Sequence, residues 1–328
     1  MIILPDFESD YNTVIRLNEE QRHNMLELQQ AGELPEKINR SSDAFFKFLL
    51  GRPARTSLLL DLINSIFGML GYQKLKTIEL VNTEMSPDSH KKKRVHFDLR
   101  GVDENGRQVN VELQKELHAH FVSRCLFHWG KNYTQQLDAG KGFSNLKPTI
   151  MVSLLGSNMF KDDELSVWDF VLINPRTGKI LTQDELLIYV EMEKVYDRLK
   201  VLRDKIKTTP DYEFTEAERV TLWSGYIRNV EIGVEIVNQT AQKDQVFHEV
   251  IEAESSYWSN PENRYAQFME QIAELDARAF LEDAEERGIQ QGSKQEKEKT
   301  ARAMLENGIK IELVSKITEL SIEELKRL

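Results

Sequence analysis

The stretch from Val95 to Gln114 reads VHFDLRGVDENGRQVNVELQ, and it decides how the chain folds. Two short runs within it alternate apolar and polar residues, and Asn105 and Gly106 lie between the two runs. A period of two interrupted by an Asn-Gly pair is typical of a β-hairpin. The sequence therefore predicts two antiparallel strands joined by a tight turn at these residues.

Each run places its residues on two faces, because successive side chains of a strand point to opposite sides of a sheet. The apolar face carries Val95, Phe97 and Leu99 from the first run and Val109, Val111 and Leu113 from the second. The polar face carries His96, Asp98 and Arg100 from the first run and Gln108, Asn110, Glu112 and Gln114 from the second. We expect both apolar rows to face one core.

The length of the turn follows from a parity argument. Residues paired across an antiparallel ladder share a face, so their numbers must sum to an even total if both apolar rows face one core. A two-residue loop of Asn105 and Gly106 gives an odd total and is excluded. A three-residue loop, 104–106, pairs Asp103 with Arg107 and lets Gly106 supply the left-handed backbone conformation.

The same register places Asp98 opposite Glu112, with facing Cβ atoms about 4.5–5.5 Å apart. Two facing carboxylates repel each other and destabilise a strand pair. One interpretation is a solvated polar face that Arg100 and Arg107 screen. The other is a shared hard cation, because Mg²⁺ binds through one or two carboxylates and keeps waters for a substrate phosphate. The hairpin alone leaves both interpretations open.

An Asp on one strand followed by Glu-x-Gln on the next resembles the PD-(D/E)xK nuclease signature. More narrowly, the chain resembles the recombination-promoting nucleases, also described as PD-(D/E)xK family transposases. The residues that carry this narrower resemblance are Ser42-Asp43-x-x-Phe46-Lys47, Leu49 to Gly51, Leu59 to Phe67, then Arg124, Tyr133, Gln136, Leu137 and Gly140, and finally Val190 to Lys194. The similarity covers about residues 41–195 well and the tail loosely.

The resemblance implies an α/β fold with a restriction-endonuclease-like core, in which helices flank a mixed central sheet, and an all-α C-terminal tail. Strands that alternate with helices point independently to an α/β core. We expect an N-terminal arm over 1–40 and a nuclease-like domain over 41–245. A helical linker over 246–299 and a small helical module over 300–328 would follow.

The resemblance also implies the site residues. Asp98, Glu112 and Gln114 would be catalytic, with Asp43 in support. Asp98 and Glu112 would hold Mg²⁺ or Mn²⁺. The third signature position is normally Lys, whereas Gln114 carries no charge; the family itself often has Gln there. Lys47 or Lys115 could supply part of the missing positive charge.

Candidates for contact with DNA lie around these acids. The resemblance implies that Lys47, Arg124 and Gln136 bind substrate. Lys92 and Lys93 belong to a basic run directly before the Asp98 strand. Basic side chains neutralise backbone phosphates without reading sequence, so phosphate contact is the functional interpretation of this run. A solvated loop tip is the alternative.

Composition limits the partners. The chain has 328 residues and a formal net charge of −11, so it has no global basic field that would attract nucleic acid. Any DNA contact must come from local Lys and Arg. The single cysteine, Cys125, excludes an internal disulfide and fits a reducing cytoplasm. The start of the chain lacks a signal-peptide pattern, and no apolar run is long enough to span a bilayer, so we expect a cytoplasmic protein without membrane contact.

Further elements follow from local patterns. We expect helices near 42–51, 56–67 and 117–137, and strands over 75–81, 149–155 and 188–192, the last half-buried. His118, His120, Cys125 and His128 invite a zinc site, but their spacing is not that of two ligand pairs. The pairs Thr215/Glu218 and Ser321/Glu324 predict capping boxes at two helix starts.

The last residues, 301–328, predict three short helices. These could form a DNA-binding helix-turn-helix, but they lack an obvious basic recognition face. A dimerisation or docking module is the alternative, and the resemblance implies a homo-oligomer formed through the C-terminal helices.

The function implied by the resemblance is a metal-dependent DNA endonuclease, linked to recombination, mobile elements or phage defence. The alternative is a catalytically inactive nuclease fold that acts as a structural or regulatory module. A transposase that joins strands ranks last, because the sequence shows no second acidic triad.

Overall fold

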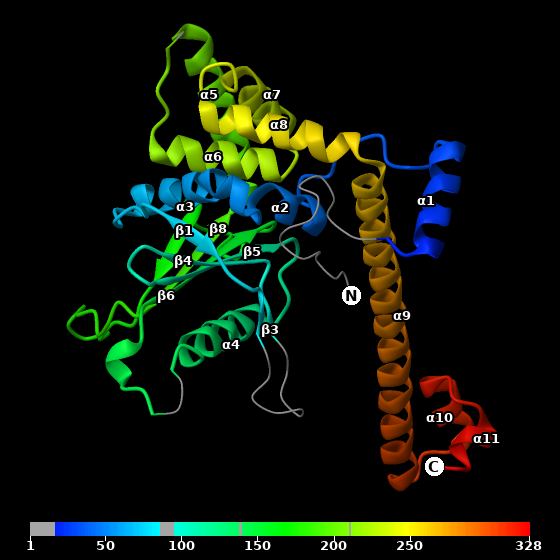
Figure 1. The fold of residues 1–328 in the computed structure, drawn as a ribbon. Helices are drawn as coiled ribbons and strands as arrows, with labels where there is room; N and C mark the ends of the chain where they lie inside the picture. The colour runs from blue at the N-terminus through cyan, green and yellow to red at the C-terminus, as the bar shows by residue number, and fades with distance from the viewer. Residues whose placement is uncertain (1–16, 86–94, 138–139, 210) are drawn as a thin grey trace. The chain divides into compact units, whose positions relative to one another are not determined.

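A computed structural model describes residues 17–85, 95–137, 140–209 and 211–328. The chain divides into two compact units, residues 1–268 and 269–328. The first unit is built on a six-stranded mixed sheet with the strand order β1-β4-β5-β6-β8-β7 (Figure 1). Its strands are β1 (Ile78–Leu80), β4 (Leu99–Asp103), β5 (Gln108–Gln114), β6 (Thr149–Leu155), β7 (Val167–Phe170) and β8 (Glu185–Glu191). A separate two-stranded ladder joins β2 (Glu84–Met85) and β3 (Val95–His96).

The hairpin has the predicted register. β4 and β5 are antiparallel, and Leu99 pairs with Val111. The loop has three residues, since the Asp103 N–H donates to the Arg107 carbonyl and Gly106 has a φ of 81°. Strand β1, which lies within the strand predicted over 75–81, pairs antiparallel with β4. Parity alone therefore identified the correct loop length.

The first strand of the hairpin differs from the prediction, because it is broken at Phe97 and Asp98. Leu99 belongs to the main core with Val109 and Val111, whereas Phe97 belongs to a second apolar cluster with Met151. The expectation that Phe97 and Leu99 share a face is therefore wrong. The physical reason is a bend, in which the Asp98 carboxylate accepts the Leu113 N–H at 2.9 Å.

The main core lies between one face of the sheet and a group of helices. These helices are α2 (Asp43–Leu50), α3 (Thr56–Leu70), α5 (Tyr196–Thr208), α6 (Glu216–Ile227), α7 (Glu231–Thr240) and α8 (Gln245–Ser259), all on the same side in Figure 1. Ser42 caps α2 through its bond from the Phe45 N–H, and the Thr215/Glu218 capping box starts α6, as predicted. Gly71 ends α3 in the left-handed conformation.

The other face of the sheet is covered by α4 (Phe121–Thr134), which lies below the strands in Figure 1. Phe121 and Cys125 of α4 pack against Met151 and Tyr189 of the sheet. The Trp129 Nε1–H donates to the Thr149 carbonyl at 3.0 Å, which fixes the helix to β6. Short 3₁₀ turns occupy Pro53–Arg55, Phe143–Asn145 and Met192–Val195.

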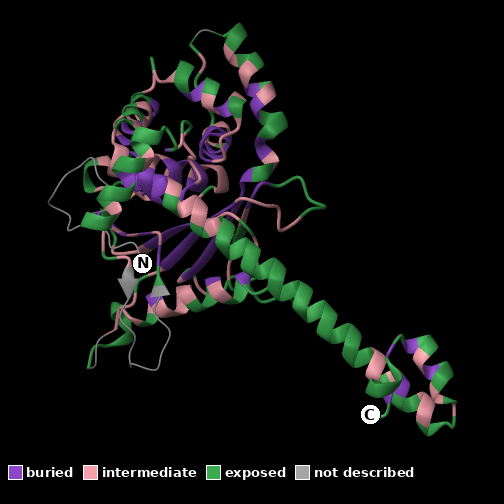
Figure 2. Ribbon diagram, turned by 90° about the vertical axis from the view of Figure 1, so that its right-hand side faces the viewer, coloured by how far each residue is buried: buried purple, intermediate pink, exposed green. Residues whose placement is uncertain are grey.

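Strand β8 is buried along its whole length, so the prediction of a half-buried strand was wrong. It lies between β6 and β7, with helices over one face and the second apolar cluster over the other. Its terminal acid, Glu191, is fully buried because Lys194 and two backbone N–H groups satisfy its carboxylate. Figure 2 shows the buried strands at the centre of this unit.

Helix α8 belongs to the first unit. The sequence predicts a polar linker from residue 246, whereas Phe247, Val250 and Tyr257 of α8 are buried in the main core. Tyr257 packs edge-on against two aromatic rings of α2, Phe45 and Phe48, each 5.0 Å away. The N-terminal α1 (Glu19–Ala31) forms a small cluster of its own with Tyr265 of the long helix α9 (Pro261–Glu306).

The second unit holds most of α9 together with α10 (Ile311–Thr318) and α11 (Ile322–Leu325). Its core consists of Ala301, Val314, Leu320 and Leu325. Gly308 allows the turn after α9, and the predicted Ser321/Glu324 capping box starts α11. Among the helices that the structure describes, none combines the length and the apolarity that crossing a membrane requires.

Candidate active site

Asp98 lies where β4 begins, and two elements hold its side chain. The Leu113 N–H of β5 donates to its Oδ2 atom at 2.9 Å. On the other side, the Lys47 Nζ atom of α2 lies 3.6 Å from its Oδ1 atom and 2.8 Å from the Asp43 carboxylate. The Asp98 side chain keeps 26% of its surface exposed. Lys47 therefore bridges Asp43 and Asp98, and solvent reaches Asp98.

Glu112 lies on β5, one residue before the backbone N–H that Asp98 accepts. Its Oε1 atom lies 2.8 Å from the His128 Nδ1 atom of α4. The side chain is 8% exposed, and Oε2 has no hydrogen-bond partner in the described part of the chain. One carboxylate oxygen is thus fixed by the helix, and the other is available.

The charges of Asp98 and Glu112 act on each other and shift the pKa of Asp98. Burial raises the pKa of Asp98 to about 6; the charge of Lys47 opposes this rise, and the charges of Asp43 and Glu112 add to it. For Lys47, burial acts to lower the pKa, but the attraction of Asp43 and Asp98 outweighs it and raises the pKa. Negative charge is therefore concentrated here, and one ammonium group offsets part of it.

Helix α4 contacts the polar face of the hairpin through three side chains. Arg124 donates to the Gln114 side chain, His128 contacts Glu112, and Asn132 accepts from Arg100 at 3.1 Å. We name these three contacts the polar ladder. They are regular because four residues of a helix advance about 6 Å, close to the roughly 6.6 Å that two residues of a strand advance.

His128 is the site residue that the sequence analysis missed, since it considered this histidine only for a zinc site. A signal was present: 124 and 128 are spaced by four on a predicted helix, and 112 and 114 are spaced by two on a predicted strand. The two spacings match in length, so a polar row of the helix could have been aligned with the polar row of the strand.

The other predicted residues take varied positions. Gln114 bonds both Arg124 and the Glu116 carbonyl, so its amide is engaged on both sides. Gln136 bonds the backbone of Lys147 and the Thr149 hydroxyl, which pins the loop before β6. Lys92 and Lys93 lie outside the described residues. Substrate contact by Arg124 and Gln136 stays a prediction.

The donor set of the site fits a small hard cation. Asp98 and Glu112 both offer carboxylate oxygen, and Mg²⁺ needs only one or two such ligands beside its waters. The described residues contain no group of three or more His, Cys, Asp and Glu side chains that could hold a metal. The zinc interpretation of His118, His120, Cys125 and His128 therefore fails, and Cys125 is buried in the second apolar cluster.

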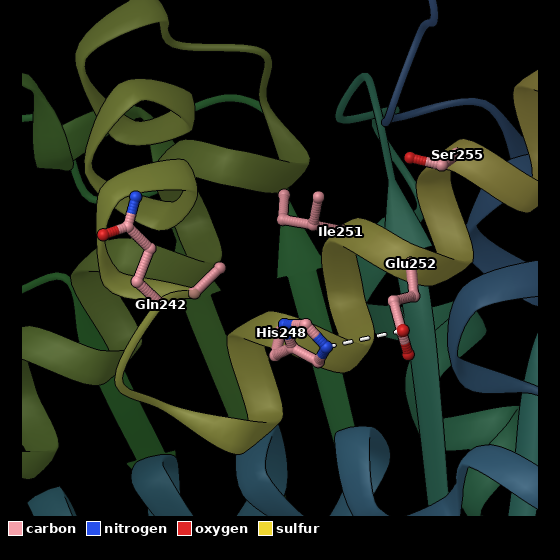
Figure 3. Close-up of a pocket in the computed structure, with 6 residues that line it drawn as sticks. Gln242, His248, Ile251, Glu252 and Ser255 are labelled. Carbon is pink, nitrogen blue, oxygen red and sulfur yellow. Dashed lines mark ion pairs between the residues drawn. The ribbon is translucent and has the colours of Figure 1, made fainter.

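A hollow of about 710 Å³ lies elsewhere on the first unit, after α7 and along α8 (Figure 3). Its lining residues are Ala241, Gln242, His248, Ile251, Glu252 and Ser255. His248 and Glu252 form an ion pair of 3.4 Å across one helix turn. None of the predicted site residues lines this hollow, so it does not extend the candidate active site.

The mixed sheet with helices on both faces defines a restriction-endonuclease-like α/β fold, in which Asp98 directly precedes β4 and Glu112 lies on the adjacent strand β5. Residues 40–284 match the family model described as PD-(D/E)XK nuclease family transposase. The chain therefore belongs to this nuclease family. Residues 294–328 match the model described as Rpn/YhgA-like nuclease family, C-terminal HTH domain, which confirms the resemblance to the recombination-promoting nucleases. Searches of curated proteins and of solved structures give no significant match.

The prediction of three short helices over 301–328 is wrong for the first, which is the end of the long helix α9. The end of α9 together with α10 and α11 matches the family's helix-turn-helix domain. Its charge is nearly balanced, with eight basic and seven acidic side chains between residues 294 and 328. The short helix α11 opens with two acids, Glu323 and Glu324.

Proposed function

We propose that this protein is a metal-dependent DNA endonuclease that hydrolyses phosphodiester bonds. The observation that carries the proposal is the charge interaction between Asp98 and Glu112 at one end of the hairpin, beside the ammonium group of Lys47. Family membership makes phosphodiester hydrolysis the expected reaction. By family, recombination, mobile elements or phage defence is the expected setting, and the cytoplasm is the expected compartment.

Asp98 and Glu112 would hold Mg²⁺ or Mn²⁺. A bound divalent ion lowers the pKa of its water and stabilises charge on the scissile phosphate. The Leu113 N–H and Lys47 orient Asp98, and His128 orients Glu112. Asp43 acts through Lys47, because it holds that ammonium group at 2.8 Å. Each acid is thus held before any substrate arrives, which reduces the reorganisation that catalysis requires.

Lys47 is the better candidate for the positive charge that Gln114 lacks. Its Nζ atom lies 3.6 Å from the Oδ1 atom of Asp98. Gln114 instead connects β5 to α4 through Arg124. We therefore assign Lys47 the electrostatic role at the scissile phosphate, and we assign Gln114 a role in positioning.

The helix-turn-helix domain is the proposed second contact with DNA. Its balanced charge predicts weak binding rather than a strong sequence-independent attraction. We also propose a homo-oligomer through the C-terminal helices. Helix α9 supports it, because Leu275, Phe280, Leu281 and Ile289 are each more than 60% exposed there. Light scattering of the wild type and Phe280→Glu tests this: a dimer that becomes a monomer supports it, and a monomeric wild type contradicts it.

Plasmid nicking with Mg²⁺ and with Mn²⁺ tests the nuclease activity. We expect the wild type to cut and Asp98→Asn to cut at least about 100-fold more slowly. The control Asp162→Asn changes an exposed acid outside the site and should cut at the wild-type rate. Equal rates for Asp98→Asn and the wild type would remove the assignment.

The competing function is a nuclease fold retained as a structural or regulatory module. Gln114 is the residue that favours this alternative. It places no positive charge at the third signature position, and its amide is already bonded to Arg124 and to the Glu116 carbonyl. This alternative predicts no cleavage with either ion and no stabilisation of the fold by Mg²⁺. A strand-joining transposase ranks below both.

A further inference from the structure

Glu112 has a specific partner on α4. The His128 Nδ1 atom lies 2.8 Å from Oε1 of Glu112, and both side chains are largely buried, at 13% and 8% exposure. An ionised carboxylate can only accept hydrogen bonds, so Nδ1 must carry the proton in this contact. The bond therefore selects one tautomer of a neutral ring and fixes one oxygen of the carboxylate.

The imidazole ring is itself held firmly. Phe97 meets it edge-on, with ring centroids 5.4 Å apart and planes at 73°. The helix that carries the ring is anchored before His128 by Arg124, which bonds Gln114, and after it by Trp129 and Asn132, which bond the Thr149 carbonyl and Arg100. The ring position is therefore set by the packing of α4, not by the flexibility of its own side chain.

A glutamate side chain has three rotatable bonds, and fixing them costs conformational entropy. His128 fixes Glu112 before a cation binds, since the contact exists without one. With Oε1 engaged, Oε2 has no partner among the described residues and is the oxygen left for a cation. Residues that hydrogen-bond a ligating carboxylate commonly control metal affinity in this way.

We infer that His128 is a positioning residue of the metal site, which orients Glu112 so that one defined oxygen receives the divalent cation. This inference rests on the proposed function, because it requires Glu112 to be a ligand. It gives the contact between His128 and Glu112, the second of the three contacts in the polar ladder, a role in metal binding. Arg124 then serves to align α4 with β5, and Asn132 to align it with β4.

The test is a titration of the full chain with Mn²⁺, in which the electron paramagnetic resonance signal of free Mn²⁺ gives the dissociation constant without any cleavage. His128→Leu and His128→Met both remove the donor and keep an apolar volume, so one can replace the other if it folds poorly. His128→Asn retains an N–H donor near the Nδ1 position. His118→Leu removes an exposed histidine of the same segment and serves as the matched control.

We expect His128→Leu or His128→Met to raise the dissociation constant about 10- to 100-fold. His128→Asn should restore most of the affinity, and His118→Leu should match the wild type. Glu112→Gln tests whether Glu112 is a metal ligand, separately from whether His128 positions it. If Glu112→Gln loses Mn²⁺ while His128→Leu and His128→Met bind as the wild type does, the positioning role is overturned alone. If Glu112→Gln binds as tightly as the wild type, the metal assignment and this inference both fall.

Discussion

The face of the sheet beneath α2, α3 and α6 is apolar, whereas the face beneath α4 is mixed. Along β5, Val109 and Val111 point into the main core, and Asn110 and Glu112 point to α4. Neighbouring residues of one strand thus meet opposite environments. The apolar face therefore supplies most of the hydrophobic stability. The face toward α4 contains buried polar groups, and these position Glu112.

The largest effect on stability is expected on the apolar face. Ile188 of β8 is fully buried in the main core. Ile188→Ala leaves a cavity there and should lower the free energy of unfolding by about 2–5 kcal/mol. Urea denaturation measures this. A loss below about 1 kcal/mol would show that this face is not the main source of stability.

The next effect concerns activity at the end of the hairpin. Lys47→Met removes the ammonium group beside Asp98 and should slow DNA cleavage on the order of 100-fold. Lys115→Met is the matched control and should cut within a few-fold of the wild type. Nicking is compared at a temperature where both variants are folded. A larger loss for Lys115→Met would transfer the electrostatic role to that residue.

A smaller effect, of opposite sign, is expected beneath α4. Asn110 is fully buried, and both its amide oxygen and its nitrogen lack a partner among the described residues. Asn110→Leu removes this unsatisfied group and should raise the free energy of unfolding by about 1 kcal/mol. Val109→Asn, one residue away on the apolar face, should lower it by at least about 2 kcal/mol. Similar changes for both variants would erase the contrast between the faces.

The smallest effect is a pH dependence in the helical layer over the apolar face. Burial acts to raise the pKa of Glu218, but hydrogen bonds from Lys205, Thr215 and Tyr212 outweigh it and lower this pKa to about 2. A lowered folded-state pKa stabilises the protein above the unfolded value of about 4.5, and the stability is lost as the pH falls toward 2.

Glu218→Gln should therefore cost about 1 kcal/mol at pH 7, where the capping box is intact, and less as the pH approaches 3. Thermal unfolding of both proteins between pH 7 and pH 3 measures the difference. A constant difference across this range would show that the ionised form of Glu218 contributes nothing.

The parts predicted from sequence are those that depend on neighbouring residues. The register of β4 and β5 followed from period and parity, and the caps at Thr215 and Ser321 followed from residues three positions apart. The bend at Asp98 could not be predicted, because it depends on a side chain that takes a backbone N–H from β5. The parity argument assumes that the first strand of the hairpin is continuous, so it could not reveal the bend.

The sequence pointed to the acids of the candidate site but not to the side chains that hold them in place. Asp98 and Glu112 stand out in the sequence because the predicted register places them opposite each other, and in the structure the charge of Glu112 acts on Asp98. The contact of His128 with Glu112 depends on how α4 docks, which no local pattern of the helix encodes. Burial of α8 was missed for the same reason, since Phe247 and Tyr257 become core residues only once α2 is in place.

The central claim is that Asp98 and Glu112 together bind a divalent cation. The most direct measurement is the thermal unfolding midpoint of the wild type, Asp98→Asn and Glu112→Gln, each without and with saturating Mg²⁺. A ligand that binds only the folded state stabilises it by about 2.7 kcal/mol at a hundredfold excess over its dissociation constant. The account predicts that Mg²⁺ raises the midpoint of the wild type by several degrees and leaves both variants unchanged. An equal rise in all three proteins, or no rise in the wild type, would contradict it.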